Sequence, residues 1–316
     1  MPAQTRHPAK GDRDMNGAIS TRMEARDWTL LLLLSAIWGC SFFLISIGVQ
    51  QFAVLTLVAL RVGVAALVLW VFVLARGLSV PRDAGTWLSF AVMGLLNNIL
   101  PFSLIAFAQT EVPSGLASIL NATTPLFTVL VSAALLADER ANLTKLAGVV
   151  LGLFGVAVMM GLDQLAGRGH GLLHQLAVLG AAVCYALSGA YGRRFARMGV
   201  RPEVAAAGMV TASALMLTPV ALATDGLPLQ ADAIHWLAAI ALGVICTGLA
   251  YLLYFGILAR AGATNISLVT FLVPVSAILL GWLFLGERLG PAHVLGMALI
   301  AAGLMLIDGR LLKWRK

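Results

Sequence analysis

Ten long apolar runs separated by short polar loops constrain the fold of this chain more than any other feature of its sequence. Each run is close to the roughly 20 residues that an α-helix needs to cross the hydrocarbon core of a bilayer. Only 11% of the residues are charged, whereas charged residues make up about a quarter of a soluble protein. The sequence therefore predicts an all-α integral membrane protein with ten transmembrane helices, at residues 28–49, 55–75, 87–108, 112–136, 143–162, 172–192, 204–223, 235–258, 264–285 and 291–308.

The two halves of the chain repeat each other at a spacing of 148 or 149 residues. Pro125 recurs as Pro274, and Glu139 recurs as Glu287, each in a similar apolar context. Because each half holds five predicted helices, an odd number, the second half must enter the membrane from the opposite face. We therefore expect two inverted five-helix repeats (5+5), an arrangement found in secondary transporters with a binding site near the bilayer midplane.

The distribution of Lys and Arg predicts the orientation of the chain. If the N terminus lies inside, 18 of the 21 Lys and Arg residues fall on the inner side, and only Arg168 and Arg288 fall outside. Inner loops of membrane proteins carry such an excess, so both termini are predicted to be cytoplasmic. The predicted topology therefore accounts for the net charge of +7. For this reason the basic charge does not indicate nucleic acid as a partner. The expected parts are a cytoplasmic N-terminal tail at 1–27, a first repeat at 28–163, a second repeat at 172–308 and a basic cytoplasmic tail at 309–316.

The titratable residues argue against catalysis and against a metal or cofactor. All 14 acidic residues and all five histidines lie in tails, loops or helix ends, so no carboxylate or imidazole is available at mid-membrane as a proton carrier. The three cysteines lie in apolar runs without the spacing of a disulfide framework or a metal site. His170 and His174 have the spacing of a metal pair, but a solvated pair is favoured over a zinc site in this glycine-rich loop.

Neutral polar and aromatic side chains gather near the middle of the predicted helices. Such groups can hold the polar head and the apolar body of a small molecule in a cavity. The same side chains also hydrogen-bond helices to each other in membranes, and this alternative stays open for each residue. The candidate substrate-binding residues are Trp38, Asn97, Asn98, Asn121, Tyr185, Ser188, Tyr251 and Thr270.

Five further residues are candidates for hinges or gates. Arg61 is the charged side chain that lies well inside a predicted helix, roughly 10 Å from the outer end of that helix. From this depth it could reach the lipid headgroups, meet the Glu287 carboxylate or contact substrate. Pro125 and Pro274 each remove a backbone donor, which kinks a helix and can free a carbonyl group for a ligand. Glu139 and Glu287 end two equivalent helices, where a carboxylate needs a cap or an ion-pair partner.

A resemblance to a known family rests on a small set of these residues: Trp38 with Gly39, Arg61, the passage that ends in Pro125, and Glu139 and Glu287 with the glycines that follow them. Over residues 28–308 this pattern resembles EamA-type transporters of the drug/metabolite transporter superfamily. The resemblance implies a central cavity lined mainly by helices 1, 3, 4, 6, 8 and 9, and movement of small metabolites. Amino acid exporters of the YddG type are a looser resemblance within that superfamily.

The expected function is secondary transport of small organic metabolites by alternating access around the midplane cavity. Amino acids, aromatic or hydrophobic ones among them, are the favoured substrates, and export is the favoured direction. We expect a monomer or weak homo-oligomer in the inner (cytoplasmic) membrane, with the substrate and the lipid bilayer as its partners. The alternatives are a non-transporting scaffold or lipid-binding protein and, less favoured, an intramembrane enzyme.

Overall fold

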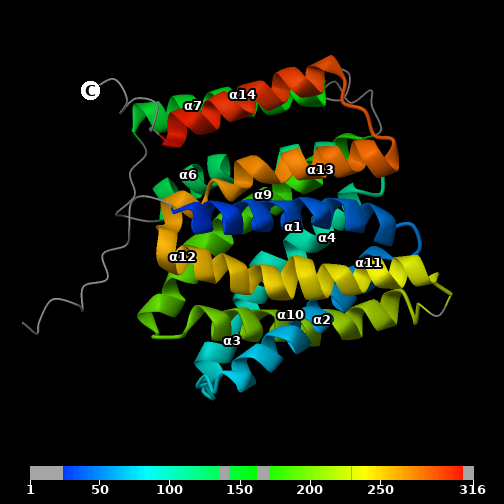
Figure 1. Cartoon of the computed structure of the whole chain (residues 1–316), viewed down its shortest axis with the longest axis vertical. Helices are drawn as coiled ribbons and strands as arrows, with labels where there is room; N and C mark the ends of the chain where they lie inside the picture. The colour runs from blue at the N-terminus through cyan, green and yellow to red at the C-terminus, as the bar shows by residue number, and fades with distance from the viewer. Residues whose placement is uncertain (1–23, 136–141, 162–170, 229, 309–316) are drawn as a thin grey trace, which may run out of the picture.

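The computed structural model describes residues 24–135, 142–161, 171–228 and 230–308, and every regular element in these ranges is helical (Figure 1). Nine helical segments of this part of the chain are long and apolar enough to cross a membrane, and Val269–Leu285 is a tenth, shorter apolar helix. The prediction of an all-α membrane protein with ten helices is therefore confirmed. The cytoplasmic placement of both termini stays a prediction. Glu139, residues 1–23 and the tail at 309–316 lie outside the described residues.

Short connections join the helices, and three of the predicted spans are built from consecutive segments. In the names used here η marks a π-helical segment. In chain order the elements are α1 (Ala25–Gly48), α2 (Val54–Ala75), α3 (Ala84–Gly94), η1 (Leu95–Ile99), α4 (Leu100–Ala108), α5 (Ser114–Asn121), α6 (Thr124–Leu135), α7 (Leu143–Met160), α9 (Leu172–Arg197), α10 (Pro202–Thr224), α11 (Ala233–Gly243), η2 (Val244–Leu249), α12 (Ala250–Ile266), α13 (Val269–Leu285) and α14 (Pro291–Asp308).

Local chemistry sets several helix ends. The Asp83 carboxylate caps α3 by accepting a hydrogen bond of 2.8 Å from the backbone N–H of Thr86. This bond lowers the pKa of the Asp83 carboxyl, because it favours the charged form. Asn142 caps α7 in the same way through the backbone of Lys145. The last helical turn of α13 is followed by Gly286, whose φ of 68° favours glycine.

Both helices predicted around a central proline are interrupted, but at different places. The break between α5 and α6 directly precedes Pro125, which is the second residue of α6 and therefore needs no helical donor. In the second repeat Pro274 lies inside α13 without ending it. Residues 264–266, predicted as the start of that helix, are helical, and Gly262, whose φ of 78° and ψ of 168° are not helical, separates them from the rest of α12. The predicted helix therefore starts just after this kink and is interrupted at residues 267–268, before α13.

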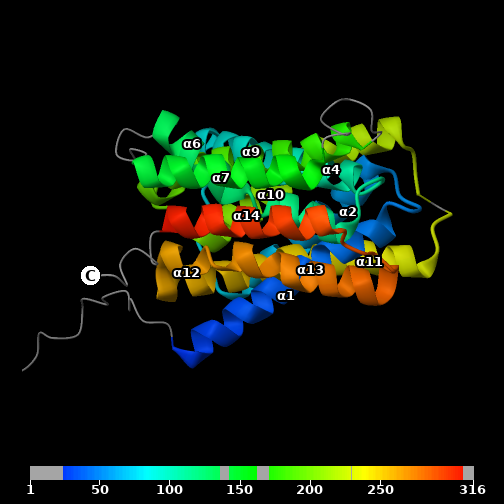
Figure 2. The same cartoon turned by 90° about the horizontal axis from the view of Figure 1, so that it is seen from above.

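The pair α7 and α14, which are equivalent helices of the two repeats, packs together at one side of the bundle (Figure 1 and Figure 2). A Cβ atom added at Gly148 would lie 2.6 Å from the carbonyl oxygen of Gly303, and one added at Gly155 would lie 2.8 Å from that of Gly296. Gly296 and Gly303 are the repeat equivalents of Gly148 and Gly155, so the contact exchanges equivalent positions. Such an exchange requires antiparallel helices related by a twofold axis, which is what inverted repeats produce.

The start of α1 and the end of α14 lie at the same end of the bundle, called here the near end (Figure 2). The far end is the opposite one, where α1 ends and α14 begins. The orientation predicted from the Lys and Arg distribution places the far end outside the cell.

Long apolar side chains cover the outside of the bundle. On α2, for example, Leu67, Val71 and Leu74 are 69%, 69% and 71% exposed. An apolar surface of this extent is costly in water but matches the hydrocarbon chains of a bilayer. The polar side chains that matter for function must therefore be sought inside the bundle.

Candidate functional site

A network of hydrogen bonds lies where η1 meets the second repeat. The Asn97 amide donates to the hydroxyl of Tyr251 at 3.0 Å, and its Oδ1 accepts from the hydroxyl of Ser188 at 2.9 Å. The Tyr251 hydroxyl donates to Oδ1 of Asn98 at 2.9 Å, and the Asn98 amide donates to Ser213 at 3.1 Å. Four predicted site residues therefore meet here, joining the first repeat to α9, α10 and α12 of the second.

Arg61 lies beside this network, seven residues beyond the start of α2, and only 6% of it is exposed. Its Nε donates a hydrogen bond of 2.8 Å to the hydroxyl of Thr247 in η2. The guanidinium carbon lies 3.7 Å from the centre of the Phe102 ring, which gives a cation–π contact. Tyr185 and Tyr251 lie within electrostatic range of the guanidinium. Arg61 and Tyr185 therefore belong to the same mid-bundle region as the asparagines.

The two π-helical segments occupy equivalent positions, since η1 and η2 begin 149 residues apart. A π-helical turn contains an extra residue and often marks a functional site. The same spacing maps Asn98 onto Thr247 and Phe102 onto Tyr251. Thr247 and Phe102 were missed as site residues from the sequence, although the repeat spacing could have indicated both.

The repeat relation also extends to the helices that face these segments. A spacing of 148 maps Arg61 of α2 onto Met209 of α10. Arg61 bonds to η2, and the sulfur of Met209 lies 3.9 Å from the amide nitrogen of Asn97 in η1. The two halves of the region thus share one geometry, but the positive charge is present in only one of them.

Aromatic rings continue this region towards α1 and α12. The ring centres of Trp38 and Tyr254 are 5.7 Å apart, and those of Tyr254 and Phe255 are 5.3 Å apart, with one ring edge-on to the other. The thiol of Cys246 in η2 donates to the carbonyl oxygen of Ile37 at 3.3 Å, which holds α1 against η2 next to Trp38. The rings supply an apolar wall near the polar network.

Asn121 and Thr270 stand apart from these contacts. Asn121 is the last residue of α5, at the break before Pro125, and its Oδ1 is enclosed without a hydrogen-bond partner among the described residues. Thr270 lies half-buried in the first turn of α13. Within the described residues, no hydrogen bond or ring contact joins either side chain to the network around Asn97.

Glu287 ties the second repeat to the first at the far end. Its carboxylate accepts hydrogen bonds from the backbone N–H of Ser114 at 2.6 Å, the Ser114 hydroxyl at 3.0 Å and the backbone N–H of Gly115 at 2.9 Å. These groups form the first turn of α5, where the helix dipole favours a negative charge. A cap or an ion-pair partner was predicted for Glu287, and its partner is the N-terminal end of α5 in the other repeat. Within the described ranges Glu287 forms no ion pair with Arg61.

Two more contacts join the repeats at the far end. Asp225, which follows α10, caps α2 by accepting from the backbone N–H of Thr56 at 3.1 Å and from its hydroxyl at 2.9 Å. The Gln51 amide donates to the Asp232 carboxylate at 2.6 Å, and Gln51 Oε1 accepts from the backbone N–H of Asp232 at 2.7 Å. The far end is therefore tied across the repeats by three separate sets of hydrogen bonds in the residues described.

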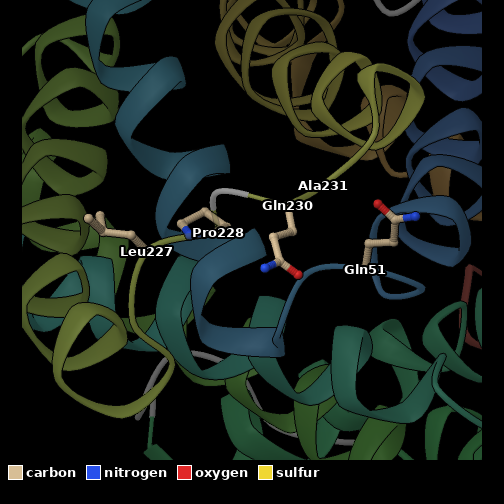
Figure 3. Close-up of a pocket in the computed structure, with 5 residues that line it drawn as sticks. All are labelled: Gln51, Leu227, Pro228, Gln230 and Ala231. Atoms are coloured by element: carbon tan, nitrogen blue, oxygen red, sulfur yellow. The ribbon is translucent and has the colours of Figure 1, made fainter.

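A hollow of about 470 Å³ opens beside these contacts (Figure 3). One of its walls is Gln51, from the turn after α1, and the others come from the loop between α10 and α11. Its lining contains no charged side chain and none of the predicted binding residues. The lining residues are Gln51, Leu227, Pro228, Gln230 and Ala231.

The histidine pair considered as a metal site is only partly described. His174 stacks on the ring of Phe107, with ring centres 4.5 Å apart, and His170 lies outside the described residues. Among the residues that the structure covers, no three His, Cys, Asp or Glu side chains gather closely enough to hold a metal ion.

Glu287→Ala should destabilise the protein by about 1 kcal/mol, since it leaves the first N–H groups of α5 without their acceptor. Glu287→Gln should lose less, because the amide oxygen still accepts a hydrogen bond. Thermal unfolding of the purified protein in detergent measures both effects. The control is Arg288→Ala, the neighbouring exposed residue; equal stability of the Glu287→Ala and Arg288→Ala variants would show that the cap contributes nothing.

Membrane-length helices in two halves, with a polar region between them, define a multi-pass membrane protein of the carrier class. A family model described as the EamA-like transporter family matches residues 28–161 and 172–308. The chain therefore belongs to the EamA-like transporter family, and it is a transporter and not an enzyme.

Several proteins are similar to this chain over nearly its whole length. The probable amino-acid metabolite efflux pump of Escherichia coli (strain K12) is 30% identical over 308 residues, which cover 93% of this chain and 98% of that protein. The uncharacterized inner membrane transporter YedA of the same strain is 30% identical, covering 88% and 89% of the two chains. The probable terminal-alkyne amino-acid exporter of Streptantibioticus cattleyicolor is 28% identical, covering 92% and 95%. One crystal structure matches with a TM-score of 0.63 at 25% identity, covering 90% of this chain and 96% of that one.

Proposed function

We propose that this protein is a secondary transporter of the inner (cytoplasmic) membrane that exports small organic metabolites, amino acids in particular, by alternating access. The observation that carries the proposal is the network from Asn97 to Ser188 and Tyr251, which spans both repeats in the middle of the bundle. Two similar proteins are named as an amino-acid metabolite efflux pump and an amino-acid exporter, and a third as an inner membrane transporter. These names support the substrate class, the direction and the membrane.

The predicted binding residues differ in burial, which suggests that some join helices and others contact substrate. Asn98 is fully buried and both polar atoms of its amide are bonded to protein, so its role is to hold the helices together. Asn97 is half-buried, as are Tyr185 and Trp38, and these three side chains are proposed to contact substrate. Asn121 offers a free acceptor at the break before α6, which suits a donor such as a substrate ammonium group.

Alternating access requires that contacts between the repeats open at one end while they hold at the other. At the far end the repeats are joined by Glu287 on α5, and at the near end the guanidinium of Arg260 lies 3.3 Å from the carboxylate of Asp27. We propose that these are the gates, with Pro125 and Pro274 as the hinges. Glu139, the repeat equivalent of Glu287, lies outside the described residues and stays a gate candidate by its place in the repeat.

Flux of labelled L-leucine and L-phenylalanine through proteoliposomes tests the proposal. We expect saturable flux that needs the protein and is unchanged by an imposed pH gradient, because the described mid-bundle region holds no carboxylate or imidazole to carry a proton. Liposomes without protein are the control.

Each outcome of this measurement has a distinct meaning. Flux that follows the pH gradient would replace the facilitated mechanism with a coupled one and keep the transporter. Absence of saturable flux for every proteinogenic amino acid would contradict the amino acid assignment, and its absence for a broad metabolite panel would favour a scaffold.

A further inference from the structure

Arg61 is a buried positive charge whose hydrogen-bonding capacity is mostly unused. The guanidinium has five N–H donors, and within the described residues it donates one hydrogen bond, from Nε to Thr247. Nη1 and Nη2 make no hydrogen bond there, and neither is fully enclosed by neighbouring atoms. A charge at this depth of a membrane protein is costly unless an opposite charge meets it.

No protein carboxylate of the described ranges supplies that opposite charge. The acidic side chains that join the repeats are already bonded elsewhere: Glu287 to the first turn of α5, Asp225 to the first turn of α2, and Asp27 to Arg260. The groups around Arg61 are instead a threonine hydroxyl, a phenylalanine ring, two tyrosines and the thiol of Cys246, none of them a carboxylate. The guanidinium is therefore held in place but not neutralised.

The contacts that hold Arg61 leave one edge of its guanidinium group free. Thr247 fixes the Nε side, and the guanidinium carbon lies over the Phe102 ring, 3.7 Å from its centre. The remaining edge carries Nη1 and Nη2, which present parallel N–H groups in the geometry that binds a carboxylate with two hydrogen bonds. Tyr185 and Tyr251 lie within electrostatic range of the guanidinium. Their rings are therefore the candidates to receive an apolar body attached to the carboxylate.

We propose that Arg61 binds the carboxylate of the transported molecule, and that the mid-bundle site selects metabolites carrying a free carboxylate group on a small apolar body. The proposal rests on the transport function proposed above and adds the group by which the substrate is recognised. Asn97, bonded to the same Tyr251 hydroxyl that lies near the guanidinium, would hold the opposite edge of the site. The bound carboxylate supplies the charge that the protein itself does not.

Matched ligands test this inference by binding, independently of flux. In the aliphatic series, L-leucine is compared with 4-methylpentanoate, which lacks the amino group, and with L-leucinamide and 3-methylbutylamine, which lack the carboxylate. The aromatic series consists of the corresponding compounds L-phenylalanine, 3-phenylpropanoate, L-phenylalaninamide and 2-phenylethylamine. Thermal stabilisation of the purified protein in detergent, in chloride-free buffer, gives the affinity of each. We expect the carboxylates to bind about tenfold or more tightly than the amides and amines.

Variants of Arg61 connect this preference to the residue. Arg61→Gln should weaken carboxylate binding about tenfold or more and leave the weak binding of the amides unchanged, and Arg61→Lys should restore only part of the loss, since an ammonium group lacks the two-pronged edge. The control is Arg76→Gln at the other end of the same helix, where an exposed guanidinium lies 5.5 Å from the Phe72 ring. Arg76→Gln should bind like the unmodified protein.

Several results would overturn the inference. Equal affinity of the unmodified protein for leucine and leucinamide, and for phenylalanine and phenylalaninamide, would overturn it, as would a carboxylate preference that persists in Arg61→Gln. Stabilisation by chloride that carboxylates do not exceed, or absence of stabilisation by any carboxylate, would overturn it as well. If the Arg61 variants do not fold, the ligand series on the unmodified protein still decides. Flux without carboxylate preference would refute this inference alone, whereas Arg61-dependent carboxylate binding without flux would refute only the transport function.

Discussion

Replacing Tyr251 with Phe should lower substrate flux about tenfold or more, although the ring itself is kept. The lost hydroxyl donates to Asn98 and accepts from Asn97, so one oxygen atom serves two side chains of the first repeat. Asn98 is fully buried, and a buried polar group left without its partner costs about 1–3 kcal/mol. Because each 1.4 kcal/mol corresponds to about a factor of ten in an equilibrium, the conformation that holds both repeats around the substrate should be depopulated. Counterflow of labelled L-leucine in proteoliposomes measures the effect.

The matched control for this variant is Tyr191→Phe. Tyr191 also lies on a helix of the second repeat, but its hydroxyl accepts a hydrogen bond from the exposed side chain of Arg194 at 2.6 Å, away from the network. Tyr191→Phe should transport normally. If Tyr251→Phe and Asn97→Leu both transported as fast as this control, the network would not be part of the substrate site.

Gly148→Ala should destabilise the protein by about 1–3 kcal/mol, because the new methyl group would lie 2.6 Å from the carbonyl oxygen of Gly303 and force α7 away from α14. Small residues let membrane helices approach closely, and the shortest contact of the new methyl group is with a backbone atom, which cannot yield as a flexible side chain can. The loss should appear as a lower midpoint of thermal unfolding in detergent. Gly303→Ala should have a similar effect, since its methyl group would meet the backbone of Gly148.

Gly189→Ala on α9 provides the control. This glycine is exposed, and a Cβ atom there would have no neighbouring atom within 4 Å. Alanine favours a helix over glycine by up to about 1 kcal/mol, so this variant should be as stable as the unmodified protein or more stable. If the variants at Gly148 and Gly189 behaved alike, close packing of α7 on α14 would not contribute to stability.

The number and type of the helices could be predicted from sequence because a bilayer restricts the solutions. A run of about 20 apolar residues has to form a helix there, since no water is present to satisfy the backbone. Gly148 and Gly155 recur in the sequence as Gly296 and Gly303, and the structure shows that these glycines bring α7 and α14 into close contact. Predictions failed where backbone geometry departs from a straight helix: neither the turns at 122–123 and 267–268 nor the two π-helical segments were foreseen.

Partners of individual side chains could not be predicted, because they depend on how the two repeats meet. The sequence indicated that Glu287 needs a cap, but only the packed structure shows that the cap is at Ser114, 173 residues away along the chain. Ser213 is an ordinary residue of an apolar helix until it is seen next to Asn98. The binding roles of Trp38, Asn121 and Thr270 stay predictions that flux measurements on their variants can test.

The matching positions of η1 and η2 indicate that the π-helical turn was present before the side chains of the two halves diverged. An extra residue in the same turn of both repeats is inherited most simply from one ancestral five-helix unit that was later copied. Two identical copies facing each other would have formed a symmetric site, with the same side chains on both walls. The present chain has Asn97 and Asn98 on one wall and Cys246 and Thr247 on the other. The two walls of the proposed site thus share one backbone shape but differ in side-chain chemistry, which is what a ligand with two different ends would require.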